Sequence, residues 1–310
     1  MDPILSDHDK ERRRKWRRSA FWKGFFVALA VIGAGIAFAG WRGEDADGSA
    51  RLGRQQIARY QIDGVIADDP ERDRMLAALA RDSSVRGLVL RINSPGGTTA
   101  GSEALYDSIR RIAATRPVVA QLTEVAASGG YVAAIAADHI VARGNTLTGS
   151  IGVIMEYPNF TDVMSRLGVG WETVRSSELK AEPSPFRPTN PEARALDEAL
   201  VQDGFRWFRD LVGERRGLEG PSLDAVATGA AFSGRLALDA GLVDEIGGEP
   251  EAIAWLESRE PDLAGLPVRD WEVESNTGWV RGLLGSAGTT SGILGEISRL
   301  TGPKLYSLGP

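Results

Sequence analysis

The chain has 310 residues, enough for a domain with a sizeable core, and carries a formal net charge of −6. It contains no Cys and only His8 and His139, which excludes disulfides, thiol nucleophiles and zinc sites with several imidazole ligands. Residues 1–23 carry eight Lys and Arg against four Asp and Glu, so the rest of the chain carries −10, which argues against nucleic-acid binding.

An uncharged apolar segment follows the basic leader. Residues 24–40 contain no charged side chain and would span about 26 Å as a helix, near the thickness of a bilayer core. Trp22 and Trp41 flank it where interfacial aromatic residues are expected. We predict one transmembrane anchor in the inner membrane, with a cytoplasmic N-terminus and the remaining chain on the periplasmic side. A cleaved export signal is the alternative, because Ala37-Phe-Ala39 has the form of a cleavage site.

Composition divides the chain into five parts. They are a basic cytoplasmic leader at 1–23, the anchor at 24–41, a polar Gly-rich linker at 42–54, the main domain at 55–260 and a C-terminal arm at 261–310. The C-terminal arm places Leu and Ile among glycines, so packing, membrane-surface contact and subunit contact all remain open for it.

Strand and helix patterns alternate through the main domain. Short runs rich in β-branched residues indicate buried strands, and apolar residues at helical spacing lie between them. This alternation predicts an α/β fold of βαβ units, with a parallel sheet covered by helices. Strands are expected at 56–66 (as a pair joined by a turn at Asp63-Gly64), 87–93, 117–122 and 140–143, and helices at 70–81, 101–115, 159–167, 191–217 and 250–260.

A single hydroxyl lies where one of these strands gives way to a helix. Ser128 follows the strand that begins near Pro117, and an Ala-rich stretch with the pattern of a buried helix comes after it. Gly129 and Gly130 allow another backbone to approach closely, and free N–H groups at a helix start can hold an anion. A serine nucleophile needs these features, although a Ser N-cap on an ordinary core helix also explains the pattern.

A second glycine-bearing turn, Ser94-Pro-Gly-Gly97, ends the preceding strand. Sites in α/β sheets gather at the carboxyl ends of the strands, so two such turns could each present a backbone N–H to one oxygen atom. Pro-Gly-Gly turns are common in all proteins, and only the pair of turns favours a site.

Several motifs together resemble one family. Asn93-Ser-Pro-Gly-Gly97, Ala126-Ala-Ser-Gly-Gly-Tyr131 and Thr146-Leu-Thr-Gly-Ser-Ile-Gly-Val153 occur in order and at the family's spacing. With Ser184-Pro-Phe-Arg-Pro188 and the run from Phe232 to Gly248, they resemble the short, membrane-anchored form of the signal peptide peptidase A (SppA) family. The resemblance implies a Clp protease/crotonase-like βαβ superhelix and a serine peptidase that cuts remnant signal peptides.

The resemblance also assigns roles to five residues. Ser128 is the nucleophile, Lys180 the general base, Gly97 and Gly129 the oxyanion-hole donors, and Ser150 a residue that helps to orient the lysine. A lysine acts as a base once burial has removed its charge. From the residues alone, Lys180 is a loop lysine flanked by two glutamates, and Ser150 is equally a turn hydroxyl.

Other candidates for the base are less suitable. His139 lies 11 residues after the serine, or about 16 Å along a helix, and we expect it to be a strand-entry residue. Lys304 is the only other lysine after the anchor and lies outside the matched region. An α/β-hydrolase is disfavoured because Ala126 replaces the first Gly of a Gly-x-Ser-x-Gly elbow. Two departures from the family pattern, Val132 and Glu124, leave the catalytic groups intact but bear on the substrate groove.

Three functions fit this sequence. The first is a membrane-anchored endopeptidase with a Ser/Lys dyad that cleaves apolar peptides through an acyl-enzyme, without a metal or cofactor. A crotonase-like acyl-CoA enzyme would share the fold and the paired glycine donors, but the export segment and Lys180 disfavour it. A catalytically silent membrane scaffold is disfavoured by the intact set of groups. The resemblance further implies a homo-oligomeric ring in which serine and lysine come from one protomer or from adjacent ones.

Overall fold

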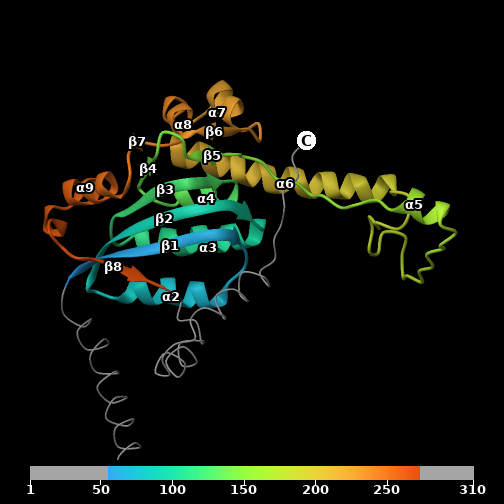
Figure 1. Cartoon of the computed structure of the whole chain (residues 1–310), viewed down its shortest axis with the longest axis horizontal. Coiled ribbons are helices and arrows are strands. Elements are labelled where there is room, and N and C mark those ends of the chain that lie inside the picture. Colours follow the sequence, from blue (N-terminus) through green and yellow to red (C-terminus); the bar gives the residue numbers. More distant parts are fainter. Residues whose placement is uncertain (1–54, 273–310) are drawn as a thin grey trace, which may run out of the picture.

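A twisted sheet of mostly parallel strands organises the computed structural model, which describes residues 55–272. The strands are β1 (Gln56–Ile66), β2 (Val85–Gly97), β3 (Val118–Ala127), β4 (His139–Ala142), β5 (Leu147–Gly149), β6 (Ala231–Ser233), β7 (Glu245–Ile246) and β8 (Val268–Trp271). The main path runs β6-β5-β3-β2-β1-β8, while β4 pairs with β3 and β7 with β4 (Figure 1). The β5–β6 pair is antiparallel and the other pairs are parallel.

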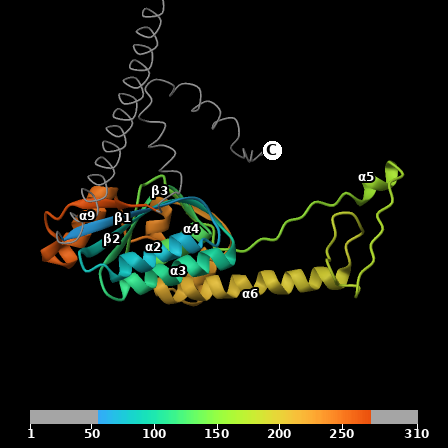
Figure 2. The same ribbon diagram turned by 90° about the horizontal axis from the view of Figure 1, so that it is seen from below.

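Helices cover both faces of this sheet (Figure 2). They are α2 (Pro70–Arg81), α3 (Thr99–Ala113), α4 (Gly129–Ile135), α5 (Thr161–Arg166), α6 (Pro191–Arg216), α7 (Gly220–Val226), α8 (Gly234–Asp239), α9 (Glu249–Arg259) and the 3-10 turn η1 (Pro261–Leu263). The larger core joins one sheet face to α2, α3, α4 and the end of α6, and a smaller core joins the other face to α9 and η1. The predicted α/β class, with a mostly parallel sheet covered by helices, is confirmed.

The first strand is continuous, so the predicted strand pair with a turn at Asp63-Gly64 is wrong. The register of β1 against β2 shifts between Asp63 and Val65, and Gly64 has a φ of 71°. The two residues Ser94 and Pro95 of β2 lie opposite Gly64 alone, and a bulge of this kind bends a strand without reversing it. The chain therefore continues to Ile66, which pairs with Gly97 at the end of β2.

The longest helix, α6, runs from the core to a lateral projection, which we define as residues 155–190. The Asn190 side chain accepts a hydrogen bond from the N–H of Glu192 at the start of α6, and Gly217 ends the helix in the left-handed conformation. Phe208 and Val212 in its second half are buried in the core. Figure 2 shows the projection, with α5, at the other end of α6 and away from the sheet.

The predicted leader, membrane anchor and linker lie outside the described residues. Within residues 55–272, no helix combines the length and the apolar character that a membrane crossing requires. Residues 268–271, in the predicted C-terminal arm, form β8 and pair with β1 at Ile57–Tyr60.

Candidate active site

The end of β2 and the start of α4, directly after β3, pack against each other. A Cβ added at Gly129 would lie 3.2 Å from Gly97 N and 2.2 Å from Ser102 Oγ. A Cβ added at Gly96 would lie 2.8 Å from Gly129 N, closer than real side chains approach. Glycine is required here because no side chain fits between the two backbones. The backbone N–H groups of Gly97 and Gly129 therefore lie close together at the carboxyl edge of the sheet.

Ser128 lies at this junction in a strained conformation. Its φ is 51° and its ψ is −120°, a combination that residues with a Cβ rarely adopt. Its backbone N–H donates to the carbonyl of Gly149 on β5, at 2.9 Å. Although Ser128 occupies the N-cap position of α4, its hydroxyl makes no capping hydrogen bond. Helix capping therefore does not account for the serine.

A cavity of about 370 Å³ opens beside Ser128. Gly97, Gly129 and Ser150 line it together with the serine, so the structure gathers four of the five predicted site residues around one space. The rest of its wall is largely apolar and includes Val132, Val153, Ile154, Trp207 and Phe208. Of the two departures from the family pattern, Val132 faces this cavity and Glu124 does not line it.

Ser150 is held in place by backbone contacts. Its φ is 51°, and its N–H donates to the carbonyl of Ala230 at 2.9 Å. Its Oγ lies 3.4 Å from the carbonyl oxygen of Gly229, to which it donates a hydrogen bond. Ser150 thus lines the cavity, and within residues 55–272 its hydroxyl makes a single long hydrogen bond.

Lys180 does not reach this cavity within a single chain. It is exposed and belongs to the segment between α5 and α6, whereas the cavity lies at the sheet edge. Figures 1 and 2 both show that segment in the projection, far along α6 from the sheet. One copy of the chain therefore presents the serine and the lysine at two separate places.

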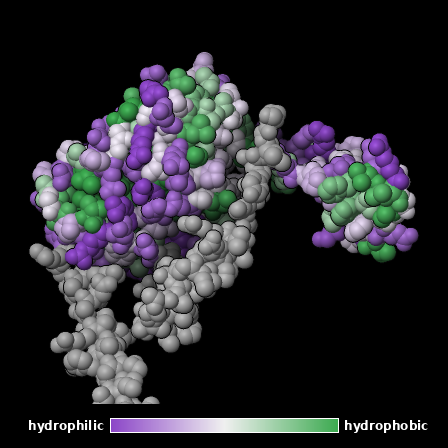
Figure 3. Space-filling view, viewed as in Figure 1, coloured by the Kyte–Doolittle hydropathy of each residue, from purple (hydrophilic) through white to green (hydrophobic). Residues whose placement is uncertain are grey.

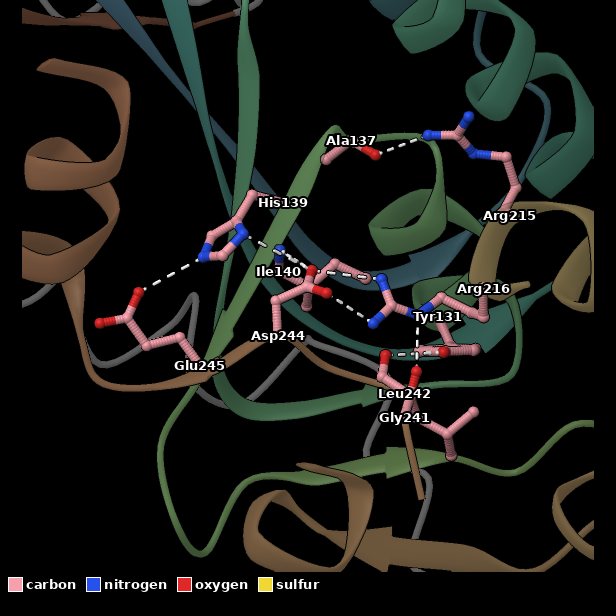
Figure 4. A network of polar contacts seen from close by, with 10 residues as sticks. All are labelled: Tyr131, Ala137, His139, Ile140, Arg215, Arg216, Gly241, Leu242, Asp244 and Glu245. Carbon is pink, nitrogen blue, oxygen red and sulfur yellow. Dashed lines mark hydrogen bonds and ion pairs between the residues drawn. The ribbon is translucent and has the colours of Figure 1, made fainter. Parts of the chain in front are cut away.

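His139 serves the fold, as its position in the sequence predicts. It is the first residue of β4, and its ring stacks on Trp255 with centroids 4.8 Å apart and planes 5° apart. Its Nε2 lies 3.3 Å from a carboxylate oxygen of Glu245 (Figure 4). It does not line the serine cavity. In the described range, 55–272, no group of three or more Asp, Glu or His side chains is arranged to hold a metal ion.

Polar contacts that the sequence did not reveal fix the two turns. The buried Ser94 donates to the carbonyl of Gly64 at 2.6 Å and accepts from Gly96 N at 3.1 Å, which shapes the first turn. On α4, Tyr131 donates to the carbonyl of Leu242 at 2.7 Å (Figure 4). Burial raises the pKa of Tyr131 well above its usual value, so the hydroxyl stays a neutral donor. Both residues lie within the quoted motifs, but motifs do not show which partners they meet.

Two family models match this chain. Peptidase family S49 matches residues 110–262, which include Ser128, Ser150 and Lys180, and the Clp protease model matches residues 59–145.

Proteins from archaea and bacteria show the same relationship. A putative protease of Methanocaldococcus jannaschii is 30% identical over 270 residues, or 82% of this chain and 86% of that protein. A putative signal peptide peptidase SppA of Enterococcus faecium is 29% identical over 246 residues, or 75% of this chain and 71% of that protein. Protease 4 of Haemophilus influenzae is 32% identical over 231 residues, which cover 71% of this chain but only 37% of Protease 4.

Proposed function

The chain belongs to the SppA-like peptidases of family S49, and on that basis we propose that it is a serine endopeptidase with a Ser128/Lys180 dyad. The observation that carries the proposal is the strained, uncapped Ser128 beside a cavity that Gly97 and Gly129, whose backbones lie close together, also line. A nucleophile needs an exposed oxygen and nearby donors for the charge that develops on the substrate.

Each group has one task in the proposed reaction. Lys180 in its neutral form accepts the Ser128 proton as Oγ attacks a peptide carbonyl carbon. Gly97 and Gly129 donate to the resulting oxyanion, and each such donor is commonly worth about 3 kcal/mol. The protonated lysine gives its proton to the leaving amine, and water then releases the acyl group from Ser128 by the reverse sequence. Ser150 would orient the lysine amine, since it lines the same cavity.

The lysine in this proposal comes from a second copy of the chain. Lys180 lies in the projection, away from the cavity of its own chain, and a neutral amine requires a buried setting that a neighbouring copy can supply. The projection also exposes many apolar side chains, and Figure 3 shows a patch of them among polar residues on its visible face. Of the 16 large apolar side chains exposed in residues 55–272, eight lie in it. They are Met155, Tyr157, Phe160, Val163, Leu167, Val169, Trp171 and Val174.

Such exposed apolar surface favours contact with other protein, because isolated soluble chains rarely leave it uncovered. A ring is the arrangement we propose. Repeated head-to-tail contact of one copy's projection with the next copy's cavity closes into a ring when the rotation allows it.

The substrates we propose are apolar peptides such as cleaved signal peptides. The cavity wall includes Val132, Trp207 and Phe208, which suit an apolar substrate side chain. Anchored by residues 24–41 on the outer face of the inner membrane, the domain would meet such peptides as they leave the bilayer.

Hydrolysis of an apolar peptide by the full-length chain in detergent tests the proposal. We expect Ser128→Ala and Lys180→Ala each to lower kcat by on the order of 10⁴-fold or more, because either change removes proton transfer to and from the nucleophile. Both variants should keep the wild-type far-UV spectrum, since neither side chain is part of the core. Unchanged turnover in either variant, or turnover of a coenzyme A thioester in place of the peptide, would contradict the dyad.

A further inference from the structure

A buried carboxylate lies two residues from Lys180. The side chain of Glu182 is only 3% exposed, although it belongs to the projection and most of its neighbours there are open to solvent. Burial of a carboxylate is unfavourable unless charged partners and hydrogen bonds compensate for the lost water. Glu182 must therefore be held by specific contacts.

Those contacts come from both sides of the lysine in sequence. Arg175 and Arg187 each form an ion pair with Glu182 Oε1, the second at 2.7 Å. The other carboxylate oxygen, Oε2, accepts a hydrogen bond from the backbone N–H of Ser184 at 3.0 Å. One carboxylate thus ties the chain before Lys180 to the chain after it.

The backbone around Lys180 also forms two successive hydrogen-bonded turns. The N–H of Lys180 donates to the carbonyl of Ser177 at 3.2 Å, and that of Glu182 donates to the carbonyl of Leu179 at 3.3 Å. These two turns share the lysine, and the Glu182 ion pairs close the loop that contains them. Lys180 consequently lies in a loop that backbone turns and ion pairs both hold in shape.

We propose that Glu182 is a positioning residue for Lys180, which it holds at the place where the amine meets the serine of a neighbouring copy. The proposal rests on the dyad proposed above. Glu182 touches neither the serine cavity nor its lining residues, and it acts only through the loop that it closes.

The chain supplies a matched control for this proposal. Glu178 is also two residues from Lys180 and also pairs with Arg175, at 2.6 Å, but its side chain is 84% exposed. An exposed pair of this kind contributes little, whereas a buried carboxylate that two arginines share fixes the geometry. The two glutamates differ in burial rather than in chemistry or in distance along the chain.

The experiment compares Glu182→Gln with Glu178→Gln in the full-length chain in detergent, using peptide hydrolysis and labelling of Ser128 by a fluorophosphonate. We expect Glu182→Gln to lower kcat and the labelling rate by about 100-fold, the effect of moving a catalytic group by about 1 Å, with KM little changed. Glu178→Gln should stay within about twofold of wild type.

A background that lacks the lysine separates positioning from general damage. In Lys180→Ala, the added change Glu182→Gln should cause no further loss of labelling, because its only route of action is gone. A further loss there, a wild-type rate for Glu182→Gln, or a fall in oligomer mass in that variant would overturn the proposal.

Two further outcomes keep the tests distinct. If Glu182→Gln fails to fold, Arg187→Met, which removes one of the two ion pairs, should still lower kcat with KM little changed, and wild-type turnover there would overturn the positioning role. Wild-type activity in Lys180→Ala alone would instead refute the dyad itself.

Discussion

Ser128 holds a backbone conformation that glycine adopts far more readily than any residue with a Cβ, with φ at 51° and ψ at −120°. The contacts on both sides keep it there, since its N–H bonds to Gly149 O and its carbonyl accepts from Tyr131 N and Val132 N. Such strain costs about 1–3 kcal/mol and is found mainly where function requires it.

This strain predicts that glycine in place of Ser128 gives a more stable domain than alanine does. Ser128→Gly should be about 1 kcal/mol more stable than Ser128→Ala, because relief of the strain exceeds the added chain entropy of glycine in the unfolded state. Both variants should be inactive. The midpoint of urea unfolding measures the difference, and a less stable glycine variant would show that the conformation is not strained.

Short sequence motifs and the family resemblance together indicate four residues that line the serine cavity. Gly97, Ser128, Gly129 and Ser150 lie in short motifs at strand ends, and strand ends of one parallel sheet meet at one edge. Glu182 was interpreted as one of two ordinary charges beside the lysine. Nothing in the sequence distinguishes it from Glu178, because burial depends on how the loop folds.

Helix α6 links the serine's surroundings to the projection. At its C-terminal end, Arg215 donates at 2.8 Å to the carbonyl of Ile135, the last residue of α4, and at 2.8 Å to that of Ala137 (Figure 4). The last carbonyls of a helix lack partners within the helix, so this arginine satisfies groups that α4 leaves free. Two helices far apart in sequence are thereby joined.

Loss of this contact should destabilise the domain measurably. Arg215→Met should lower the free energy of unfolding by about 1–3 kcal/mol, since it leaves two partly buried carbonyls without a charged donor. Arg206→Met on the same helix removes only an exposed pair with Asp203 and should cost less than about 0.5 kcal/mol. Equal stabilities of the two variants in urea would contradict the role of Arg215.

Elements with a strong periodic pattern were predictable, whereas several of the short elements were not. The helix predicted at 70–81 matches α2, and that predicted at 191–217 matches α6 within one residue. The strands β5 to β8 and helices α7 and α8 went unrecognised. They have only two to seven residues each, so tertiary pairing determines them rather than local periodicity.

Residues 55–272 present the two proposed catalytic groups at separate places along α6. The serine cavity includes Trp207 and Phe208 from the C-terminal half of α6, whereas the loop with Lys180 precedes its N-terminus at Pro191. A folded monomer is therefore expected to be inactive. The family resemblance assigns catalytic roles to both Ser128 and Lys180, but the sequence does not show how far apart they lie. Their separation follows from the length and direction of α6.

Complementation between two inactive variants tests this account most directly. The full-length Ser128→Ala and Lys180→Ala chains, co-expressed with different tags and purified through both, should regain roughly a quarter of wild-type peptidase activity. Each site then takes its serine and its lysine from two copies drawn at random, so roughly a quarter of the sites are intact. Mixed oligomers that assemble normally but remain as inactive as each variant alone would contradict a dyad shared between copies.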